Sequence, residues 1–216
     1  MGRSSDNKYK VQSTKLIQLQ ENLVFPSLFW IFQQLLHPIA FSFILGSYNI
    51  WIGKLLLFIL QKFHFLSKPV YPEELTSGKP SIFPAKFPHA LAVLLMHQLD
   101  KLERMNKKRQ DIAKIYRNKL ENIKSLTLIP DIDGSLYLRF PLLTDKPLAY
   151  IRKAKTKGIL LGNWYHHVID PAGVDYGAIG YAMGSCPKAE QVSTTVLNLP
   201  TRITSQEADN VISLFT

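Results

Sequence analysis

The sequence predicts an α/β fold in its carboxy-terminal part. Short apolar runs with strand character alternate there with helical runs, and strands separated by helices are typical of a small sheet packed against helices. The strands are expected at 136–142, 159–165 and 196–199, and the helices at 148–157, 188–194 and 205–215. A chain of 216 residues is long enough to bury a substantial core.

Local start and stop signals support these elements. Gly158 follows the first helical run, and glycine often ends a helix. Pro187 precedes the second helical run, where its missing N–H costs nothing. Thr204 or Ser205 can cap the last helix, because Glu207 follows at the spacing of a capping box. The predicted boundaries therefore have a chemical reason at each of these helices.

A long helix is expected before this alternating region, over 88–120. Pro88 suits its first position. Apolar residues recur along it at spacings of three and four, which predicts one buried stripe, and most of its lysines and arginines fall off that stripe. Such a basic run is usually a solvated face.

Composition divides the chain into four segments. Residues 1–21 form a polar leader without the apolar core of a signal peptide. Residues 22–66 are apolar and expected to be helical, and residues 67–87 form a linker rich in proline, serine, glycine and lysine. Residues 88–216 read as the α/β domain.

The apolar segment predicts short helices at 28–36, 39–45 and 50–65. Its length would suffice for a membrane span. Pro38 argues against an unbroken helix, and Gln33, Gln34 and His37 are costly in lipid. Contact with a membrane surface, where Trp30, Trp51 and flanking lysines would suit the interface, and a helical insert packed on protein both stay open.

Charge and cysteine content narrow the function further. The net charge of +10 favours an anionic partner, which a phosphorylated metabolite, a nucleic acid or a membrane surface would supply. The basic run of the long helix is not interleaved with aromatic residues as a single-strand nucleic-acid groove would be, so no specific nucleic-acid partner is expected. Cys186 is the only cysteine, which excludes an intrachain disulfide and favours a reducing, cytoplasmic location. It is expected to be buried and structural.

Four sequence blocks, in order, carry a family resemblance. They are Pro88-His89-Ala90-Leu91-Ala92 with Gln98-Leu99-Asp100-Lys101-Leu102, Tyr137-Leu138-Arg139-Phe140-Pro141, Gly158-Ile159 with Trp164-Tyr165, and Cys186-Pro187 with Asn198-Leu199-Pro200-Thr201. Together they resemble the carboxy-terminal part of the DegT/DnrJ/EryC1/StrS aminotransferases. The resemblance implies the small carboxy-terminal α/β domain of the fold-type-I, aspartate aminotransferase-like transferases, led by a long helix and preceded by the apolar segment.

The resemblance also implies a chemistry and a site. The family transaminates keto sugars linked to nucleotides, uses pyridoxal 5'-phosphate and forms homodimers. By likeness to it, Lys86, Trp164, Tyr165, His166 and His167 are expected to contact the nucleotide-sugar substrate, with Lys86 standing where the family has an arginine. No metal site is expected, because adjacent histidines on a strand point apart.

No residue of the chain matches the lysine on which the family carries its cofactor. The lysine-bearing segment would precede the long helix, and Lys8, Lys10 and Lys15 lie in a polar leader instead. The chain is therefore expected to have no catalytic residue of its own and to be inactive alone, with its cofactor-binding half on a partner. The alternative is a membrane-surface module that uses the domain as a scaffold.

Two more residues near the blocks have expected roles. Arg139 is expected to form an outward-facing ion pair rather than to bind a ligand. Asn198 is expected to satisfy backbone groups near a turn.

Overall fold

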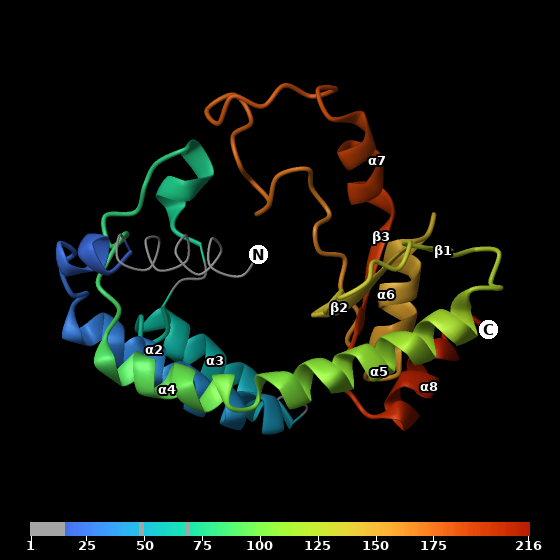
Figure 1. Ribbon diagram of the computed structural model, residues 1–216, viewed down its shortest axis with the longest axis horizontal. Coiled ribbons are helices and arrows are strands. Elements are labelled where there is room, and N and C mark those ends of the chain that lie inside the picture. Colours follow the sequence, from blue (N-terminus) through green and yellow to red (C-terminus); the bar gives the residue numbers. More distant parts are fainter. Residues whose placement is uncertain (1–15, 48–49, 68–69) are drawn as a thin grey trace, which may run out of the picture. The chain divides into compact units, whose positions relative to one another are not determined.

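The computed structural model describes residues 16–47, 50–67 and 70–216, which form two compact units (Figure 1). The first unit extends to Glu74 and resumes from Gly78 to Gln98. The second unit comprises Leu75–Ser77 and Leu99–Thr216. Most of the predicted polar leader lies outside the described residues.

The second unit is built on a three-stranded antiparallel sheet. Its strands are β1 (Thr127–Leu128), β2 (Arg139–Leu143) and β3 (Val196–Pro200), in the spatial order β1-β2-β3. Phe140 pairs with Leu199 and Leu142 with Leu197. All four of these side chains are buried, and they form the centre of the core.

Four helices accompany this sheet: α5 (Leu102–Leu120), α6 (Pro147–Thr156), α7 (Pro187–Thr195) and α8 (Ser205–Ile212). The buried stripe of α5 ends in Tyr116 and Leu120, which pack with Ala154 of α6 and Val211 of α8 in the same core. Proline opens α6 and α7, as the missing N–H at a first helical position allows. The alternating α/β pattern thus converges on one hydrophobic core.

The amino terminus of α8 has the predicted capping box. The Thr204 hydroxyl accepts a hydrogen bond from the Glu207 N–H, and the Glu207 carboxylate accepts one from the Thr204 N–H at 2.7 Å. The hydrogen bond from the Thr204 N–H, and then one that the Thr204 hydroxyl donates to the same carboxylate at 2.8 Å, lower the pKa of the exposed Glu207 carboxyl. The sequence signal for this helix start is confirmed.

The first unit is helical. It contains α2 (Leu28–Gly46), α3 (Ile52–Lys62) and α4 (His89–Leu99), and the short helix η2 (Pro72–Thr76) lies at its boundary with the second unit. Its small core consists of Ala40, Ile44 and Leu66, with leucines of α2 and α3 packed around them. Ser27 caps α2 through a hydrogen bond that its hydroxyl accepts from the Trp30 N–H at 3.2 Å.

Three predicted elements differ from the structure. The helices expected at 28–36 and 39–45 are one helix, because Pro38 removes a single N–H without ending α2. The helix expected over 88–120 is interrupted at Asp100 and Lys101, and aspartate is a poor residue for a helix interior. The strand expected at 159–165 is reduced to one bridge between Gly162 and Asn198.

Candidate functional site

The best-supported candidate site lies where residues 162–170 meet β3 in the second unit. The Gly162 N–H donates to the Asn198 carbonyl at 3.1 Å, and the Asn198 N–H donates to the Gly162 carbonyl at 2.7 Å. The buried Asn198 side chain also donates to the Trp164 carbonyl. The predicted role of Asn198 in satisfying backbone groups is therefore confirmed, and it holds the predicted site segment against the sheet.

Arg139 of β2 stacks on Trp164. The guanidinium carbon lies 4.6 Å from the centre of the Trp164 ring, within the range of a cation–π interaction. Within the described part of the chain the guanidinium forms neither an ion pair nor a hydrogen bond, so the predicted outward-facing ion pair is wrong. Its N–H donors stay available to an anionic group beside an indole that is 54% exposed.

Tyr165, His166 and His167 continue this segment. Tyr165 is exposed, and the centres of the two imidazole rings lie 4.1 Å apart. The expectation that these histidines point apart is wrong, because the segment does not form the predicted strand. His166 Nδ1 lies 3.9 Å from an Asp170 carboxylate oxygen. The described residues contain no group of three or more side chains suited to hold a metal ion.

Lys86 belongs to the first unit, and its described contacts are made there. Its N–H donates to the Val24 carbonyl at 2.8 Å, and its ammonium lies 5.2 Å from the centre of the Phe25 ring. The other four predicted site residues, Trp164, Tyr165, His166 and His167, are consecutive in the second unit. Arg139 and Asn198 contact Trp164, and Asp170 lies near His166.

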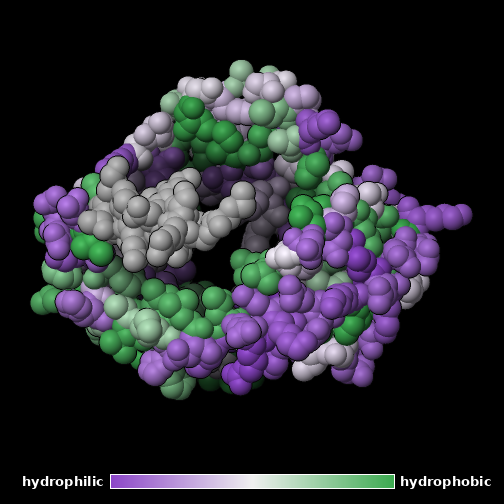
Figure 2. All heavy atoms as spheres, in the orientation of Figure 1, coloured by the Kyte–Doolittle hydropathy of each residue, from purple (hydrophilic) through white to green (hydrophobic). Residues whose placement is uncertain are grey.

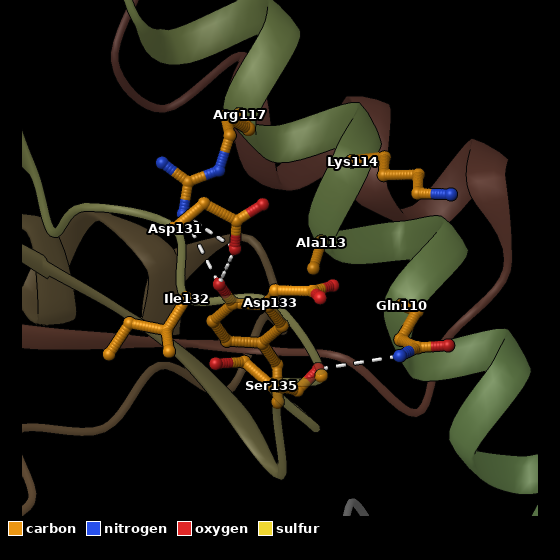
Figure 3. Close-up of a pocket in the computed structure, with 10 residues that line it drawn as sticks. Gln110, Ala113, Lys114, Arg117, Asp131, Ile132, Asp133 and Ser135 are labelled. Atoms are coloured by element: carbon orange, nitrogen blue, oxygen red, sulfur yellow. Dashed lines mark hydrogen bonds and ion pairs between the residues drawn. The ribbon is translucent and has the colours of Figure 1, made fainter.

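A small cavity of about 220 Å³ lies between α5 and the loop 131–137 (Figure 3). Arg117 forms an ion pair with Asp131 at 3.6 Å, and it also donates to the Ile129 carbonyl and the Tyr137 hydroxyl. Gln110 donates to the Ser135 carbonyl at 3.4 Å, while the Lys114 amine points away from Arg117 and Asp131. The polar groups of this cavity thus attach the loop to the helix.

The start of α7 holds a second polar cluster. The Glu190 carboxylate accepts hydrogen bonds from the Tyr181 hydroxyl at 2.7 Å and the Gly184 N–H at 2.6 Å. The hydrogen bond from Tyr181 is the main cause of a lowered pKa at Glu190, and it raises the pKa of Tyr181. Cys186 caps α7 and is exposed, so its predicted burial is wrong.

The sequence of residues 77–216 matches the DegT/DnrJ/EryC1/StrS aminotransferase family, and this segment exceeds half of the chain. The chain belongs to this family. No match was found among curated proteins.

Solved structures agree with the family in fold. A putative sugar aminotransferase of Streptococcus pneumoniae in its apo form is 19% identical, with a TM-score of 0.52. The match covers 69% of this chain and 44% of the Streptococcus chain. AtS13 of Actinomadura melliaura is 16% identical with a TM-score of 0.50, covering 68% and 40%. A DegT DnrJ EryC1 StrS aminotransferase of Brucella abortus is 20% identical with a TM-score of 0.47, covering 56% and 33%.

These findings confirm the predicted fold class, the carboxy-terminal α/β domain of the fold-type-I aminotransferases. The chain spans about a third of the length of the Brucella abortus aminotransferase. It spans less than half of the length of the other two proteins. The family implies pyridoxal phosphate as cofactor and a sugar-modifying transferase reaction.

The described residues do not fit pyridoxal phosphate by themselves. The cofactor needs a lysine amine in a desolvated pocket, an acid at the pyridine nitrogen and donors around the phosphate. None of the described lysines is buried. In the cavity between α5 and the loop 131–137, which is lined by lysine, arginine and aspartate, Arg117 and Asp131 already bind each other and the loop. No step of the reaction can be assigned to a cofactor held by these residues.

Three residues of the site, Arg139, Asn198 and Asp170, were not predicted from the sequence as ligand groups. Arg139 and Asn198 both lie in strands that were predicted, but their contacts with Trp164 join positions 25 and 34 residues apart. The available signal was an arginine inside an otherwise apolar strand, since a charge there needs a specific partner.

Proposed function

We propose that residues 77–216 are the carboxy-terminal domain of a pyridoxal-phosphate-dependent aminotransferase that acts on a nucleotide-linked keto sugar. In this proposal the chain supplies contacts to the substrate, and the lysine that carries the cofactor comes from a polypeptide segment outside these 216 residues. A homodimer or a separate cofactor-binding chain would complete the site, and the protein would act in the cytoplasm.

The observation that carries this proposal is the Arg139–Trp164 pair, held by Asn198 within the segment that matches the family. An exposed indole offers a flat apolar face to a sugar or a base. The guanidinium beside it suits a phosphate, because its planar N–H donors bind phosphate oxygens in pairs. His166 and His167, two and three residues further along the chain, add hydrogen-bonding groups.

The membrane-surface alternative concerns other residues. The apolar helices α2 and α3 precede residue 77, so they lie outside the family segment. A role for them at a membrane is compatible with the substrate contacts proposed for the second unit.

Trp164→Ala is expected to weaken binding of a nucleoside diphosphate sugar about tenfold, since stacking on an aromatic face contributes roughly 1–3 kcal/mol. Ligand-observed NMR with the full chain measures this, because it detects weak complexes. Arg139→Ala should give a similar loss that grows smaller at high salt. Trp51→Ala removes an exposed indole from the other unit and serves as the matched control. Equal affinity in the Trp164 and Trp51 variants would contradict the proposal.

The chain alone is expected to form no stoichiometric covalent adduct with pyridoxal phosphate. Borohydride reduction followed by peptide mass spectrometry measures this at one equivalent of cofactor. The expected result is sparse labelling spread over exposed lysines, because none of the described lysines lies in a desolvated pocket. Full labelling of a single lysine would show that the chain holds its own cofactor site.

A further inference from the structure

The first unit exposes many large apolar side chains, some of which appear as green surface in Figure 2. Monomeric soluble proteins rarely expose large contiguous apolar patches without a function. We call the exposed apolar side chains on and next to α2 and α3 the hairpin surface. They are Leu28, Phe29, Phe32, Ile39, Phe41, Phe43, Leu45, Ile50, Trp51, Ile52, Leu55, Phe58, Ile59, Phe63 and Phe65.

The α2 helix is apolar far beyond what its own core requires. Among the described residues it is the one helix long and apolar enough to cross a membrane by length and composition. Only 17% of its most apolar stretch is buried, whereas the core helix of a soluble protein would be mostly buried. Leu28, Phe32, Ile39 and Phe43 recur at helical spacing, so they line one exposed face.

Two of the three polar residues of α2 that the sequence marks as costly in lipid, Gln33 and His37, are satisfied inside the unit. The buried Gln33 side chain donates to the His64 carbonyl at 2.5 Å. The His37 Nε2 atom accepts from the Ser67 N–H at 3.1 Å. The Ser42 hydroxyl donates to the Pro38 carbonyl at 2.7 Å, within the helix. The cost of placing these groups near hydrocarbon is therefore largely removed.

The charged residues in the segment that carries the hairpin surface have one sign. Residues 22–72 contain no aspartate or glutamate. The Lys54 ammonium lies 4.5 Å from the centre of the Trp51 ring, and the Lys62 ammonium lies 6.0 Å from the centre of the Phe58 ring. Lysines and aromatic rings side by side suit the headgroup level of a bilayer, where the ring enters the interface and the ammonium meets a lipid phosphate.

We propose that the α2–α3 hairpin docks the protein on an anionic lipid surface. The two helices lie in the plane of the interface, with the apolar side chains entering the boundary between headgroups and acyl chains. A spanning hairpin does not fit. The 19 residues of α2 reach about 28 Å, but the 11 residues of α3 reach only about 16 Å against a hydrocarbon core of about 30 Å. The proposal does not depend on the aminotransferase function.

The charge pattern favours lipid over a protein partner. A protein interface of this size would normally be rimmed by charges of both signs, whereas the charged residues of segment 22–72 are all cations. Each lysine near an anionic surface contributes about 1 kcal/mol, and the buried apolar area adds to it.

Co-sedimentation of the full chain with vesicles tests the proposal. Vesicles of phosphatidylcholine and phosphatidylglycerol in equal parts should bring the protein into the pellet at low salt, whereas vesicles of phosphatidylcholine alone should bind it more weakly. Protein without vesicles should stay in the supernatant. Pelleting without vesicles, or no pelleting with anionic vesicles, overturns the proposal.

Paired substitutions locate the binding surface. Ile39→Glu with Phe43→Glu, at positions 58% and 68% exposed, should abolish binding to anionic vesicles. The control is Leu148→Glu with Leu138→Glu, at positions that are also 58% and 68% exposed but lie in the second unit. This control changes the net charge by the same amount, and the variant should bind vesicles as the unsubstituted protein does. Equal losses in both pairs would show that binding follows net charge alone and would overturn the proposal.

Removing the two lysines separates charge from apolar contact. Lys54→Gln with Lys62→Gln should weaken binding to anionic vesicles about 25-fold, because each lost charge should weaken it about fivefold. Binding to neutral vesicles should change little. Lys155→Gln with Lys157→Gln is the matched control in the second unit.

Fluorescence quenching by brominated lipid locates the docking surface in variants that each retain one tryptophan. The fluorescence of Trp51 should be quenched, and that of Trp164 should not. Quenching of Trp164 alone would place the docking surface elsewhere.

Discussion

Replacing Phe140 by alanine is expected to lower the free energy of unfolding of the second unit by about 3–5 kcal/mol. The Phe140 side chain is 1% exposed in the middle of β2. The centres of the Tyr116 and Tyr137 rings each lie 5.5 Å from it, and the Arg117 guanidinium lies 5.6 Å from it. Its loss therefore leaves a cavity lined by three aromatic or cationic groups, none of which can fill it.

Denaturant unfolding, followed by the fluorescence of Trp164 in a Trp30→Phe, Trp51→Phe background, measures this change in the second unit. Leu138→Ala is the matched control, because Leu138 lies two residues before Phe140 with its side chain exposed. A change within about 0.5 kcal/mol is expected there. Similar losses in both variants would contradict the assignment of Phe140 to the centre of the core.

The Phe140 substitution also bears on the candidate site. Arg139 precedes Phe140 in β2, and Phe140 pairs with Leu199 next to Asn198 in β3. Both residues that hold Trp164 are thus fixed by the same two-strand contact. A loss of ligand binding in Phe140→Ala is expected to follow the loss of stability, whereas Trp164→Ala should reduce binding without destabilising the fold.

The parts of the fold that the sequence predicts well depend on local chemistry. Pro187, Pro200 and the Thr204–Glu207 capping box lie within a few residues of the boundaries that they define, and the structure confirms these boundaries within about two residues. Residues 196–199 are uniformly apolar apart from Asn198, and β3 is buried along its length.

The parts that the sequence predicts poorly depend on contacts between distant residues. The segment after Gly158 has the composition of a strand, but only Gly162 finds a partner in β3. Pro38 predicts a break, yet α2 continues because tertiary contacts of Leu36 before it, and of Ala40 and Ile44 after it, stabilise the helix on both sides. The arginine in an apolar strand indicates that Arg139 has a partner, but no local signal identifies Trp164 as that partner, since the two residues lie 25 positions apart.

Tyr116→Phe is expected to destabilise the second unit by about 1–3 kcal/mol at neutral pH. The Tyr116 side chain is fully buried, and its hydroxyl donates to the Pro200 carbonyl at 2.9 Å. The substitution keeps the ring that packs against Phe140 and removes only the donor, so the carbonyl at the end of β3 loses a partner in the core. Tyr165→Phe removes an exposed hydroxyl and should change the free energy of unfolding by less than about 0.5 kcal/mol.

The same variant is expected to change the response to alkaline pH. Burial, and secondarily the Glu207 carboxylate, raise the pKa of Tyr116 above its ordinary value in the folded state. Below about pH 10 the residue is protonated in both states, so its contribution to stability is fully present and constant. Above that pH the unfolded state releases the proton first, and the free energy of unfolding falls by up to about 1.4 kcal/mol per pH unit.

Tyr116→Phe should lack this part of the fall, so the stability difference between the two proteins should narrow steadily from about pH 10 upward. Comparing the two proteins cancels the contribution of Tyr181, whose pKa is also raised, because Tyr181 is present in both. Denaturant unfolding at a series of pH values from neutral to strongly alkaline provides the measurement. Parallel profiles would mean that Tyr116 ionises equally in the folded and unfolded states, which is incompatible with a buried hydroxyl bonded to Pro200.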